Sequence, residues 1–352
     1  MIRARTGLRA AAAALATLAL VATRAQPDDG FAPVAAPAEH RRPADQTFLT
    51  FPEWFLVFSP AEYAYYVRSR TPTRFPFLGH VRQFWQSYGA VYGRIRAQYP
   101  FNAGYHVMIM VIGTSTTVEY VLRSAYETLI GRLSELTAGG TLTEEDRYGA
   151  AVAQDYVDFI RVEPWYKYDF RSKLVGLWRD TPPWGPAPLR KWERRYALTT
   201  EYAIKAGYGW LIKLGTQASY DTPLPVTAVL LSHLPEGAQA ALPELKILKA
   251  LPDGATLVTV PRYDAFMRYA DGLARRGATF IEIAGNRSTI LVSAIVPDGW
   301  RMPAGAKLLF AQPILTRPGQ QRVALEVAVA SLAPLLDRLR EDGVAPEHVF
   351  DY

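Results

Sequence analysis

Apolar residues recur every three or four positions along the first two thirds of the chain, and this period predicts helices. The clearest ones are predicted over 77–98, 104–136, from Thr143 onward, and over 189–218. The second of these carries an apolar stripe made of Tyr126, Leu129, Ile130, Leu133 and Leu136. We expect this stripe to face a helical core, with Arg132 and Glu135 turned outward.

Two capping-box patterns mark the start of the helical region. Thr50 stands three residues before Glu53, and Ser59 stands three residues before Glu62. The pattern of a hydroxyl followed by a carboxylate at this spacing predicts a helix start at each site. Ordered structure is therefore expected from about Thr47 onward.

After Asp221 the hydrophobic period changes from that of a helix to that of a strand. Strands are predicted over 226–232, 246–251, 255–260, 279–284, 289–296, 307–312, 322–329 and 347–352, and helices over 263–276 and 331–342. The strand–helix–strand pieces at 255–284 and 322–352 are alike in order and length. A doubled unit of this kind favours an antiparallel sheet with two helices on one face, a ferredoxin-like arrangement. The Gly285-Asn286 pair suits a tight turn between adjacent strands.

These patterns predict an α+β protein with four regions. We expect a signal peptide over 1–25, a disordered linker over 26–46, an aromatic-rich helical bundle over 47–220 and a ferredoxin-like domain over 221–352.

The N-terminal segment has the order of features found in export signals. Arg3, Arg5 and Arg9 precede an apolar stretch over 10–22, and small residues follow up to Ala25. This order predicts cleavage after Ala25, with an uncleaved amphipathic anchor as the alternative. The apolar stretch is shorter than the roughly 20 residues of a membrane span. We therefore expect an exported protein, either periplasmic or peripheral on the outer face of the inner membrane.

Cleavage changes the charge balance of the chain. The precursor has 39 basic and 33 acidic residues, a net charge of +6. Four of the arginines precede the cleavage site, so 35 basic residues remain and the net charge falls to +2. A near-neutral exported protein gives no support to a nucleic-acid partner.

The supply of cofactor ligands is small. The absence of cysteine excludes disulfides, thiolate-bound zinc, iron–sulfur clusters and c-type haem attachment. Neither histidine of the predicted helices, His80 or His106, has a second histidine or a carboxylate three or four positions later, so no helical metal pair is predicted. We predict no metal site and no cofactor.

The segment 104–122 is open to three interpretations. Ser115 follows an apolar run and a glycine, as in a nucleophile elbow, but Thr117 replaces the second glycine of that motif. The segment also has the length of a membrane span, although it contains charged and hydroxyl residues. The interpretation we favour is a helix buried at the centre of the bundle, with Glu119 paired to Arg123 one turn later.

Aromatic residues are concentrated in the helical region. Of the 43 in the chain, 34 lie between Phe48 and Tyr220, interleaved with arginines. Such a mixture suits the headgroup level of a bilayer, stacking on a flat ligand, or ordinary packing under arginine stems. The candidate ligand-binding residues are His80, Trp85, Trp165 and Tyr166.

The leading functional hypothesis is an envelope-associated, non-enzymatic binding or accessory protein. Its partner is expected to be the membrane surface or an envelope protein, and a small apolar ligand is a further option. One alternative is a hydrolase using Ser115, or an acid–base site with Glu119 and His106. The other is a carrier of haem, quinone or another apolar ligand.

Overall fold

The computed structural model describes residues 34–43, 45–216 and 224–350, and it is an α+β protein. The described chain divides into two compact units. A helical unit comprises 54–84 and 102–216, and a sheet unit comprises 34–53, 85–101 and 224–350. The predicted signal peptide, its cleavage site at Ala25 and the expected domain boundary at 220 lie outside the described residues.

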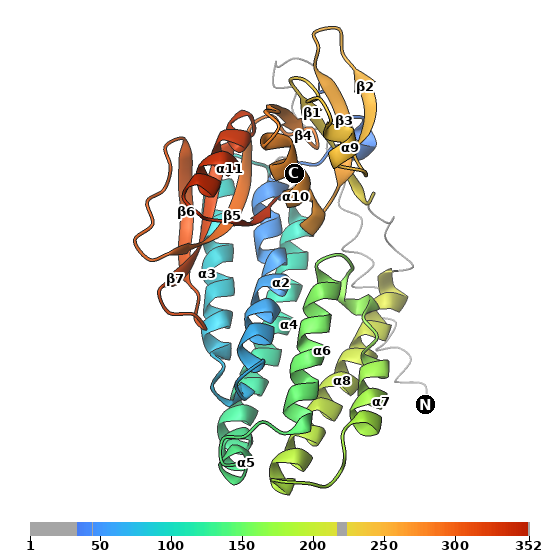
Figure 1. Cartoon of the computed structure of the whole chain (residues 1–352), viewed down its shortest axis with the longest axis vertical. Helices are drawn as coiled ribbons and strands as arrows, with labels where there is room; N and C mark the ends of the chain where they lie inside the picture. Colours follow the sequence, from blue (N-terminus) through green and yellow to red (C-terminus); the bar gives the residue numbers. More distant parts are fainter. Residues whose placement is uncertain (1–33, 44, 217–223, 351–352) are drawn as a thin grey trace. The chain divides into compact units, whose positions relative to one another are not determined.

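The helices match the hydrophobic periods of the sequence closely. They are η2 (Ala38–His40), α2 (Gln46–Val67), η3 (Pro72–Arg74), α3 (Phe77–Ile95), α4 (Ala103–Tyr126), η4 (Glu127–Gly131), α5 (Arg132–Thr137), α6 (Glu144–Ile160), η5 (Trp165–Lys167), α7 (Phe170–Asp180) and α8 (Pro188–Thr216). Helices α6, α7 and α8 pack side by side (Figure 1). The segments α4, η4 and α5 follow one another without a break, as the apolar period over 104–136 predicts.

The helix starts were predicted with mixed success. Thr143 caps α6 through a complete capping box with Asp146. The two boxes expected near the start of the helical region are wrong, because α2 is one continuous helix through both sites. The Thr50 hydroxyl donates to the Gln46 carbonyl at 2.8 Å, so it bonds back along the helix instead of capping it. The Ser59 hydroxyl is buried and forms a hydrogen bond with the Tyr120 hydroxyl of α4.

Aromatic side chains make most of the apolar core of the helical unit. One cluster joins α6, α7 and α8, and another joins the start of α3 to α4. Their buried members are Val152, Tyr168, Phe170, Leu177, Leu198 and Tyr202 in the first, and Phe75, Phe77 and Tyr120 in the second. Ser59 and Tyr120 link α2 to α4 by a buried hydroxyl–hydroxyl bond of 2.6 Å.

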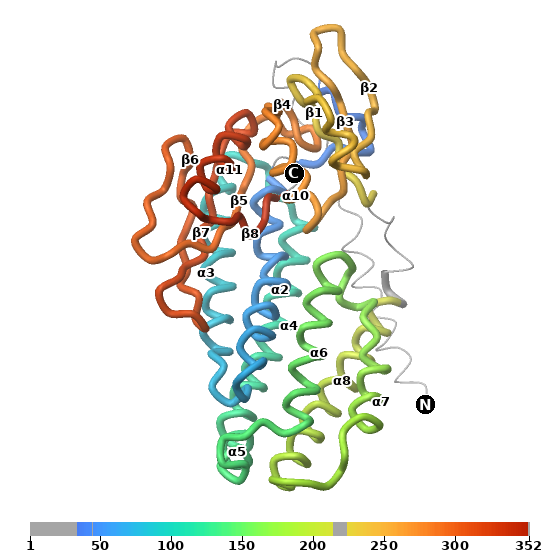
Figure 2. The backbone as a smooth tube through the Cα atoms, viewed as in Figure 1, coloured from blue at the N-terminus to red at the C-terminus, as the bar shows by residue number. Residues whose placement is uncertain are grey.

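The sheet unit contains two antiparallel sheets of four strands each. Its elements are β1 (Val226–Leu231), α9 (Ala238–Ala241), β2 (Lys246–Ala250), β3 (Thr256–Pro261), α10 (Asp264–Ala274), β4 (Phe280–Ile283), β5 (Thr289–Pro297), β6 (Ala306–Pro313), β7 (Gln320–Ala328), η6 (Val329–Ser331), α11 (Leu332–Glu341) and β8 (Pro346–Val349). The strand orders are β2-β3-β1-β4 and β6-β7-β5-β8, so the second sheet repeats the first (Figure 2). The expected doubling is present, but each copy forms its own sheet where we expected one shared sheet.

The predicted turn after β4 connects the two copies. Ala284 and Gly285 both have positive φ, and Ile283 and Asn286 exchange backbone hydrogen bonds of 2.8 and 2.9 Å. This is the geometry of a two-residue hairpin turn. Its flanking strands then diverge, because β4 pairs with β1 while β5 pairs with β7 and β8. The chain thereby passes from the first sheet to the second.

The described end of the predicted linker is ordered. The backbone N–H groups of Ala35 and Ala36 donate to the Glu282 carboxylate at 3.1 and 2.8 Å. Ala36 is buried beside Ala228 and Leu230 of β1. The expectation of a disordered linker is therefore wrong for 34–43. Composition could not predict the order of this segment, because the segment is held by a carboxylate nearly 250 positions later.

Candidate functional site: an apolar face above buried ion pairs

The rod formed by α4, η4 and α5 turns its apolar stripe to solvent. Leu122, Leu129 and Leu133 are 65%, 67% and 67% exposed, and Val118 and Leu136 continue the same side. Glu127 and Ser134 are buried on the opposite side, and Glu135 accepts hydrogen bonds from Thr71 and Thr73, whereas Arg132 is exposed as expected. The exposure of the stripe reverses its expected orientation, and it also corrects the interpretation of 104–122 as a helix buried at the bundle centre.

Helix α8 carries a second exposed apolar stripe. Its members follow one another at helical spacing and so lie along one side of the helix. They are Leu189, Trp192, Tyr196, Ile204, Tyr208 and Leu211. We call the two stripes together the apolar face.

The two stripes belong to an internal repeat. Residues 117–130 read Thr-Val-Glu-Tyr-Val-Leu-Arg-Ser-Ala-Tyr-Glu-Thr-Leu-Ile, and 199–212 read Thr-Thr-Glu-Tyr-Ala-Ile-Lys-Ala-Gly-Tyr-Gly-Trp-Leu-Ile. Equivalent residues have equivalent exposure. Tyr120 and Tyr202 are both buried, whereas Leu122 and Ile204 are 65% and 64% exposed. The repeat therefore specifies which side of each helix faces inward.

Four charged residues of the repeat form a reciprocal cluster between α4 and α8. Arg123 contacts Glu119 of its own helix and Glu201 of α8, both at 3.4 Å. Lys205 contacts Glu201 of its own helix at 2.7 Å and Glu119 of α4 at 3.1 Å. The predicted Glu119–Arg123 pair is confirmed.

This reciprocity shows that the two helices run antiparallel and are related by a local two-fold axis. An axis that exchanges two antiparallel helices stands perpendicular to the plane of the pair. Equivalent side chains therefore point to the same side of that plane. The stripes of α4 and α8 thus lie on one side of the helix pair and form a joint surface.

The opposite charges in the cluster hold Glu201 and Lys205 ionised. Burial by itself raises the pKa of Glu201, but the charges of Arg123 and Lys205 outweigh this effect and lower it to about 2. Burial opposes the charge on Lys205 as well, and the two carboxylates nevertheless raise its pKa. Glu201 and Lys205 consequently keep fixed charges over the ordinary pH range.

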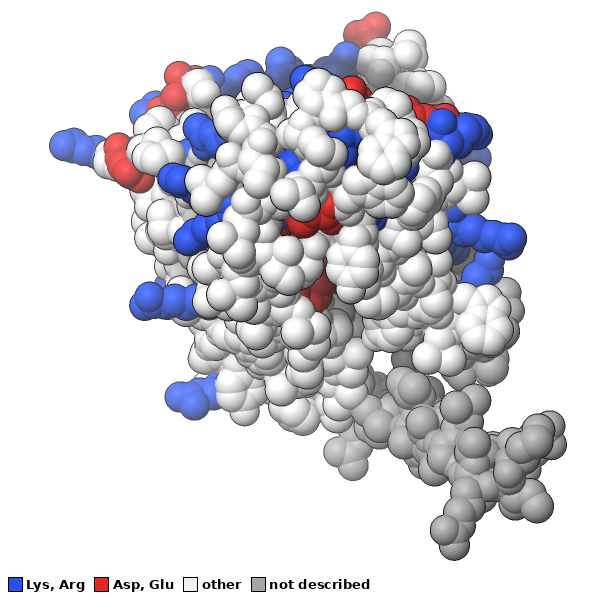
Figure 3. All heavy atoms as spheres, turned by 90° about the horizontal axis from the view of Figure 1, so that it is seen from below, with Lys and Arg blue, Asp and Glu red and all other residues white. Residues whose placement is uncertain are grey.

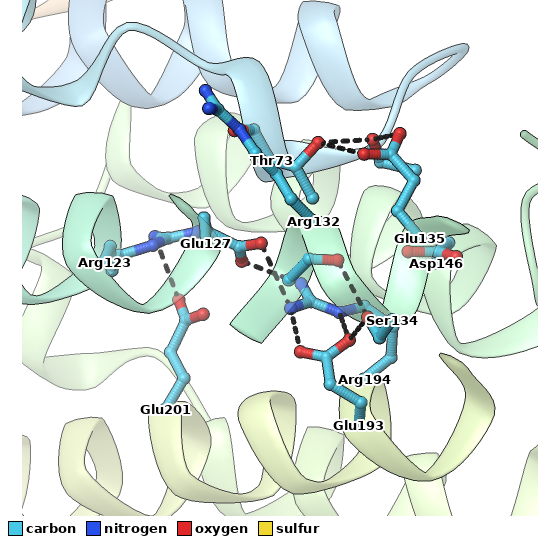
Figure 4. A network of polar contacts seen from close by, with 12 residues as sticks. Thr73, Arg123, Glu127, Arg132, Ser134, Glu135, Asp146, Glu193, Arg194 and Glu201 are labelled. Carbon is cyan, nitrogen blue, oxygen red and sulfur yellow. Dashed lines mark hydrogen bonds and ion pairs between the residues drawn. The ribbon is translucent and has the colours of Figure 1, made fainter. Parts of the chain in front are cut away.

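A second network surrounds the guanidinium of Arg194 (Figure 4). Arg194 binds both carboxylate oxygens of Glu127, at 2.8 and 3.1 Å, and also pairs with Glu193. The Ser134 hydroxyl donates to Glu193 at 2.8 Å. Since 4% of the Arg194 side chain is exposed, this network is an internal support of the bundle.

The start of α8 adds three more buried cations. Arg190 pairs with Asp146 at 2.7 Å, and Lys191 and Arg195 both contact Glu145, at 3.1 and 2.7 Å. The side chains of all three cations are at most 2% exposed. The helical unit therefore buries charges between its helices while apolar side chains remain on its surface.

Tryptophans gather near both ends of α8. Near its start, Trp178, Trp184 and Trp192 form edge-to-face contacts, and the Arg195 guanidinium lies 5.1 Å from the Trp178 ring. Near its end, Trp165 stacks on Tyr208 at 5.3 Å, and Trp210 is 64% exposed. Rings with one polar atom suit a boundary between apolar and aqueous surroundings.

The end of the molecule that carries α5 is poor in charge (Figure 3). Uncharged side chains cover most of the visible surface, and Lys and Arg project mainly around its border. Some Asp and Glu atoms are visible near the middle, between uncharged side chains.

The candidate catalytic residues do not converge. Ser115 lies in the middle of α4, exposed, and its hydroxyl donates to the Ile112 carbonyl at 3.0 Å. The described residues before it contain no strand, and α4 continues through the position, so the elbow interpretation is wrong. His106 is buried on the same helix, where burial lowers its pKa, and Glu119 is committed to the charge cluster. At 1.5 Å per residue, the thirteen positions between His106 and Glu119 separate them by about 20 Å.

The candidate ligand-binding residues fall into separate surroundings. His80 is fully buried, stacks on Phe75 at 4.8 Å between ring centres, and has Nε2 3.7 Å from the Glu62 carboxylate. Trp165 and Tyr166 pack beside α8 through Tyr208 and the backbone near Gly209. Trp85 belongs to the sheet unit and contacts Tyr88.

The described residues contain neither a cluster of metal ligands nor a helix that could span a membrane. No cluster of three or more His, Asp or Glu side chains has a geometry suited to a metal ion within the described ranges. In the same part of the chain, every helix lacks either the length or the apolar content needed to cross a membrane.

Sequence reasoning missed the inward side of the helical unit. The sequence assigned no separate role to four cations of α8 that are all buried and paired, namely Arg190, Lys191, Arg194 and Arg195. The repeated Thr-x-Glu-Tyr motif could have identified the inward side, because it aligns the sequences of two helices and places their glutamates at equivalent positions.

Comparison with known proteins adds no relative, since no family model, curated protein or solved structure matches the chain. The apolar face and the charges beneath it are therefore the features from which a function can be inferred.

Proposed function

We propose that this chain is a non-enzymatic binding or accessory protein that rests on a membrane surface through the apolar face. The observation that carries the proposal is the orientation of α4, η4, α5 and α8, which turn Glu127, Arg190 and Arg194 inward and expose leucine, isoleucine and tryptophan. Exposed apolar patches of this extent mark surfaces that another phase or molecule covers.

The composition of the face favours lipid as the covering phase. Aliphatic residues run along α4 and α5, and tryptophans lie near both ends of α8. From Trp192 to Trp210 is eighteen residues, or about 27 Å of helix. Apolar faces of this kind bury themselves at the boundary between headgroups and acyl chains, where tryptophan is enriched. An envelope protein covering the same face is the alternative partner.

The separation of Ser115, His106 and Glu119 supports a binding role over the hydrolase alternative. The export features of residues 1–25 support a location outside the cytoplasm. Both the signal peptide and the periplasmic or outer-face location stay predictions.

Co-sedimentation with phosphatidylcholine vesicles tests the proposal. The triple variant Leu122→Gln/Leu129→Gln/Leu133→Gln removes aliphatic side chains that are already exposed, so folding should be preserved. Each loss should cost about 1 kcal/mol of membrane binding, which weakens the triple variant by about 100-fold.

The matched control is Leu248→Gln, at an exposed leucine of the sheet unit. The control should bind like the wild type. Equal binding by the triple variant and the wild type, or no binding by the wild type, would contradict the proposal.

A further inference from the structure

A hollow of 590 Å³ opens beside the apolar face within the helical unit. Its walls come from η3, the first turn of α3, the end of α4 and the segments η4 and α5. Its polar lining includes Arg74, Arg132, Ser124 and Thr128. A volume of this size lies within the range of sites that hold small ligands.

Positive charge dominates the hollow. Arg74 and Arg132 are exposed, and neither forms an ion pair within the part of the chain that the structure describes. Arg132 is oriented by a long hydrogen bond of 3.4 Å from Nε to the Thr73 carbonyl. The one carboxylate in the lining, Glu127, is already neutralised by the two-pronged contact with Arg194. An anion entering the hollow therefore meets two available guanidinium groups.

The backbone beside the hollow has an uncommon form. Residues 127–131 form a π-helical turn, a feature that is rare and frequent at functional sites. Gly131 permits it, because a Cβ at this position would collide with the Glu127 carboxylate and lie 3.2 Å from Thr73. Thr128, within this turn, and Ser124, one turn earlier, both line the hollow and offer hydroxyl groups.

We infer that this hollow binds the phosphate group of an anionic lipid. Guanidinium groups bind phosphate oxygens through paired, charge-assisted hydrogen bonds, and serine and threonine hydroxyls add further donors. Leu78 lines the hollow and is 55% exposed, which gives an acyl chain an apolar exit. Leu129 and Leu133 of the apolar face flank Arg132 in the sequence. The inference rests on the proposed membrane role and names the headgroup chemistry that this role would select.

Binding of the full-length protein to two kinds of vesicle tests the inference. One kind contains phosphatidylcholine alone, and the other also contains phosphatidylglycerol. Wild-type protein should bind the anionic vesicles more tightly. Arg74→Gln and Arg132→Gln should each weaken this binding by about fivefold, and the double variant by about 30-fold. Binding to phosphatidylcholine alone should change little in all three.

The matched control is Arg171→Gln, which removes an exposed arginine of α7, outside the hollow lining. It should leave the preference for anionic vesicles intact. A double variant that keeps the wild-type preference, or that loses no more than the control, overturns the inference.

Calorimetric titration with inorganic phosphate separates the lipid from a soluble phosphate source. One outcome is that the wild type binds phosphate, the double variant does not, and the wild type binds neither kind of vesicle. This result would support a phosphate site and contradict the membrane role. Vesicle binding without any anionic preference would support the membrane role and overturn the phosphate site. The two failures are therefore distinguishable.

Discussion

Replacing Arg194 by methionine removes the central cation of the buried network while keeping most of the side-chain volume. The guanidinium is 4% exposed and binds Glu127 through two contacts of 2.8 and 3.1 Å. Without it, Glu127 remains buried as an uncompensated charge. Breaking a buried ion pair in this way costs about 3–5 kcal/mol. We expect the free energy of unfolding to fall by that amount.

Urea denaturation followed by far-ultraviolet circular dichroism measures this change. Arg179→Met is the control, because the Arg179 side chain is 72% exposed and pairs with Asp180 on the surface. An exposed pair of this type contributes less than about 1 kcal/mol. If Arg194→Met lowered the free energy of unfolding no more than the control, the buried ion pairs would not stabilise the bundle.

A second substitution distinguishes a stranded charge from lost packing. The double variant Arg194→Met/Glu127→Gln removes the stranded carboxylate as well as the cation. It should recover about 1–2 kcal/mol relative to Arg194→Met alone. A double variant that is less stable than Arg194→Met would show that the loss comes from packing around the methionine.

Three further predictions follow from the helical unit. The pKa of Glu201 is about 2 in the folded protein and 4.5 ordinarily. Its contribution to the free energy of unfolding is therefore present above pH 4.5 and is lost as the pH falls toward 2. Glu201→Gln should flatten this part of an acid-denaturation profile. Gly131→Ala should destabilise by about 1–3 kcal/mol in thermal unfolding, despite the higher helix propensity of alanine, because its Cβ displaces Glu127. Ser59→Ala should cost about 1–3 kcal/mol in urea by leaving the Tyr120 hydroxyl unpaired, whereas Ser115→Ala at an exposed site should cost less than about 0.5 kcal/mol.

The spacing of hydrophobic residues along the sequence predicted the positions of most helices and strands correctly. The strands expected over 289–296 and 322–329 are β5 and β7, and the helix expected over 331–342 is α11. Period succeeds for α10 and α11, each of which buries one side, whereas β3 and β5 are buried almost throughout and are recognised as apolar runs. The doubling of the strand–helix–strand piece was also visible, although the number of sheets depends on long-range pairing that no local pattern encodes.

The rotation of the surface helices could not be predicted in the same way. An amphipathic stripe was assumed to face the core, and Leu129 and Leu133 instead face outward. The assumption failed because the opposite side of the helix finds ion-pair partners, such as Glu127 with Arg194, across the bundle. Partners separated by 67 positions are not apparent from periodicity. The repeat that contains Glu119 and Glu201 was the one local signal of the inward side.

The capping-box error has a related cause. The patterns at Thr50 and Ser59 are compatible with a helix start, but each hydroxyl has another partner, the Gln46 carbonyl or the Tyr120 hydroxyl. A short motif therefore located neither the start of α2 nor a break within it.

Burial of the apolar face in lipid is the central claim, and thiol labelling tests it most directly. The chain contains no cysteine, so Leu122→Cys, Leu133→Cys and Ile204→Cys each introduce a single site for a polarity-sensitive dye. Leu248→Cys, at an exposed leucine of the sheet unit, is the reference. With phosphatidylcholine vesicles, the emission of the first three should shift to the blue, and that of the reference should not. Unchanged, water-like emission at all three sites would contradict the claim.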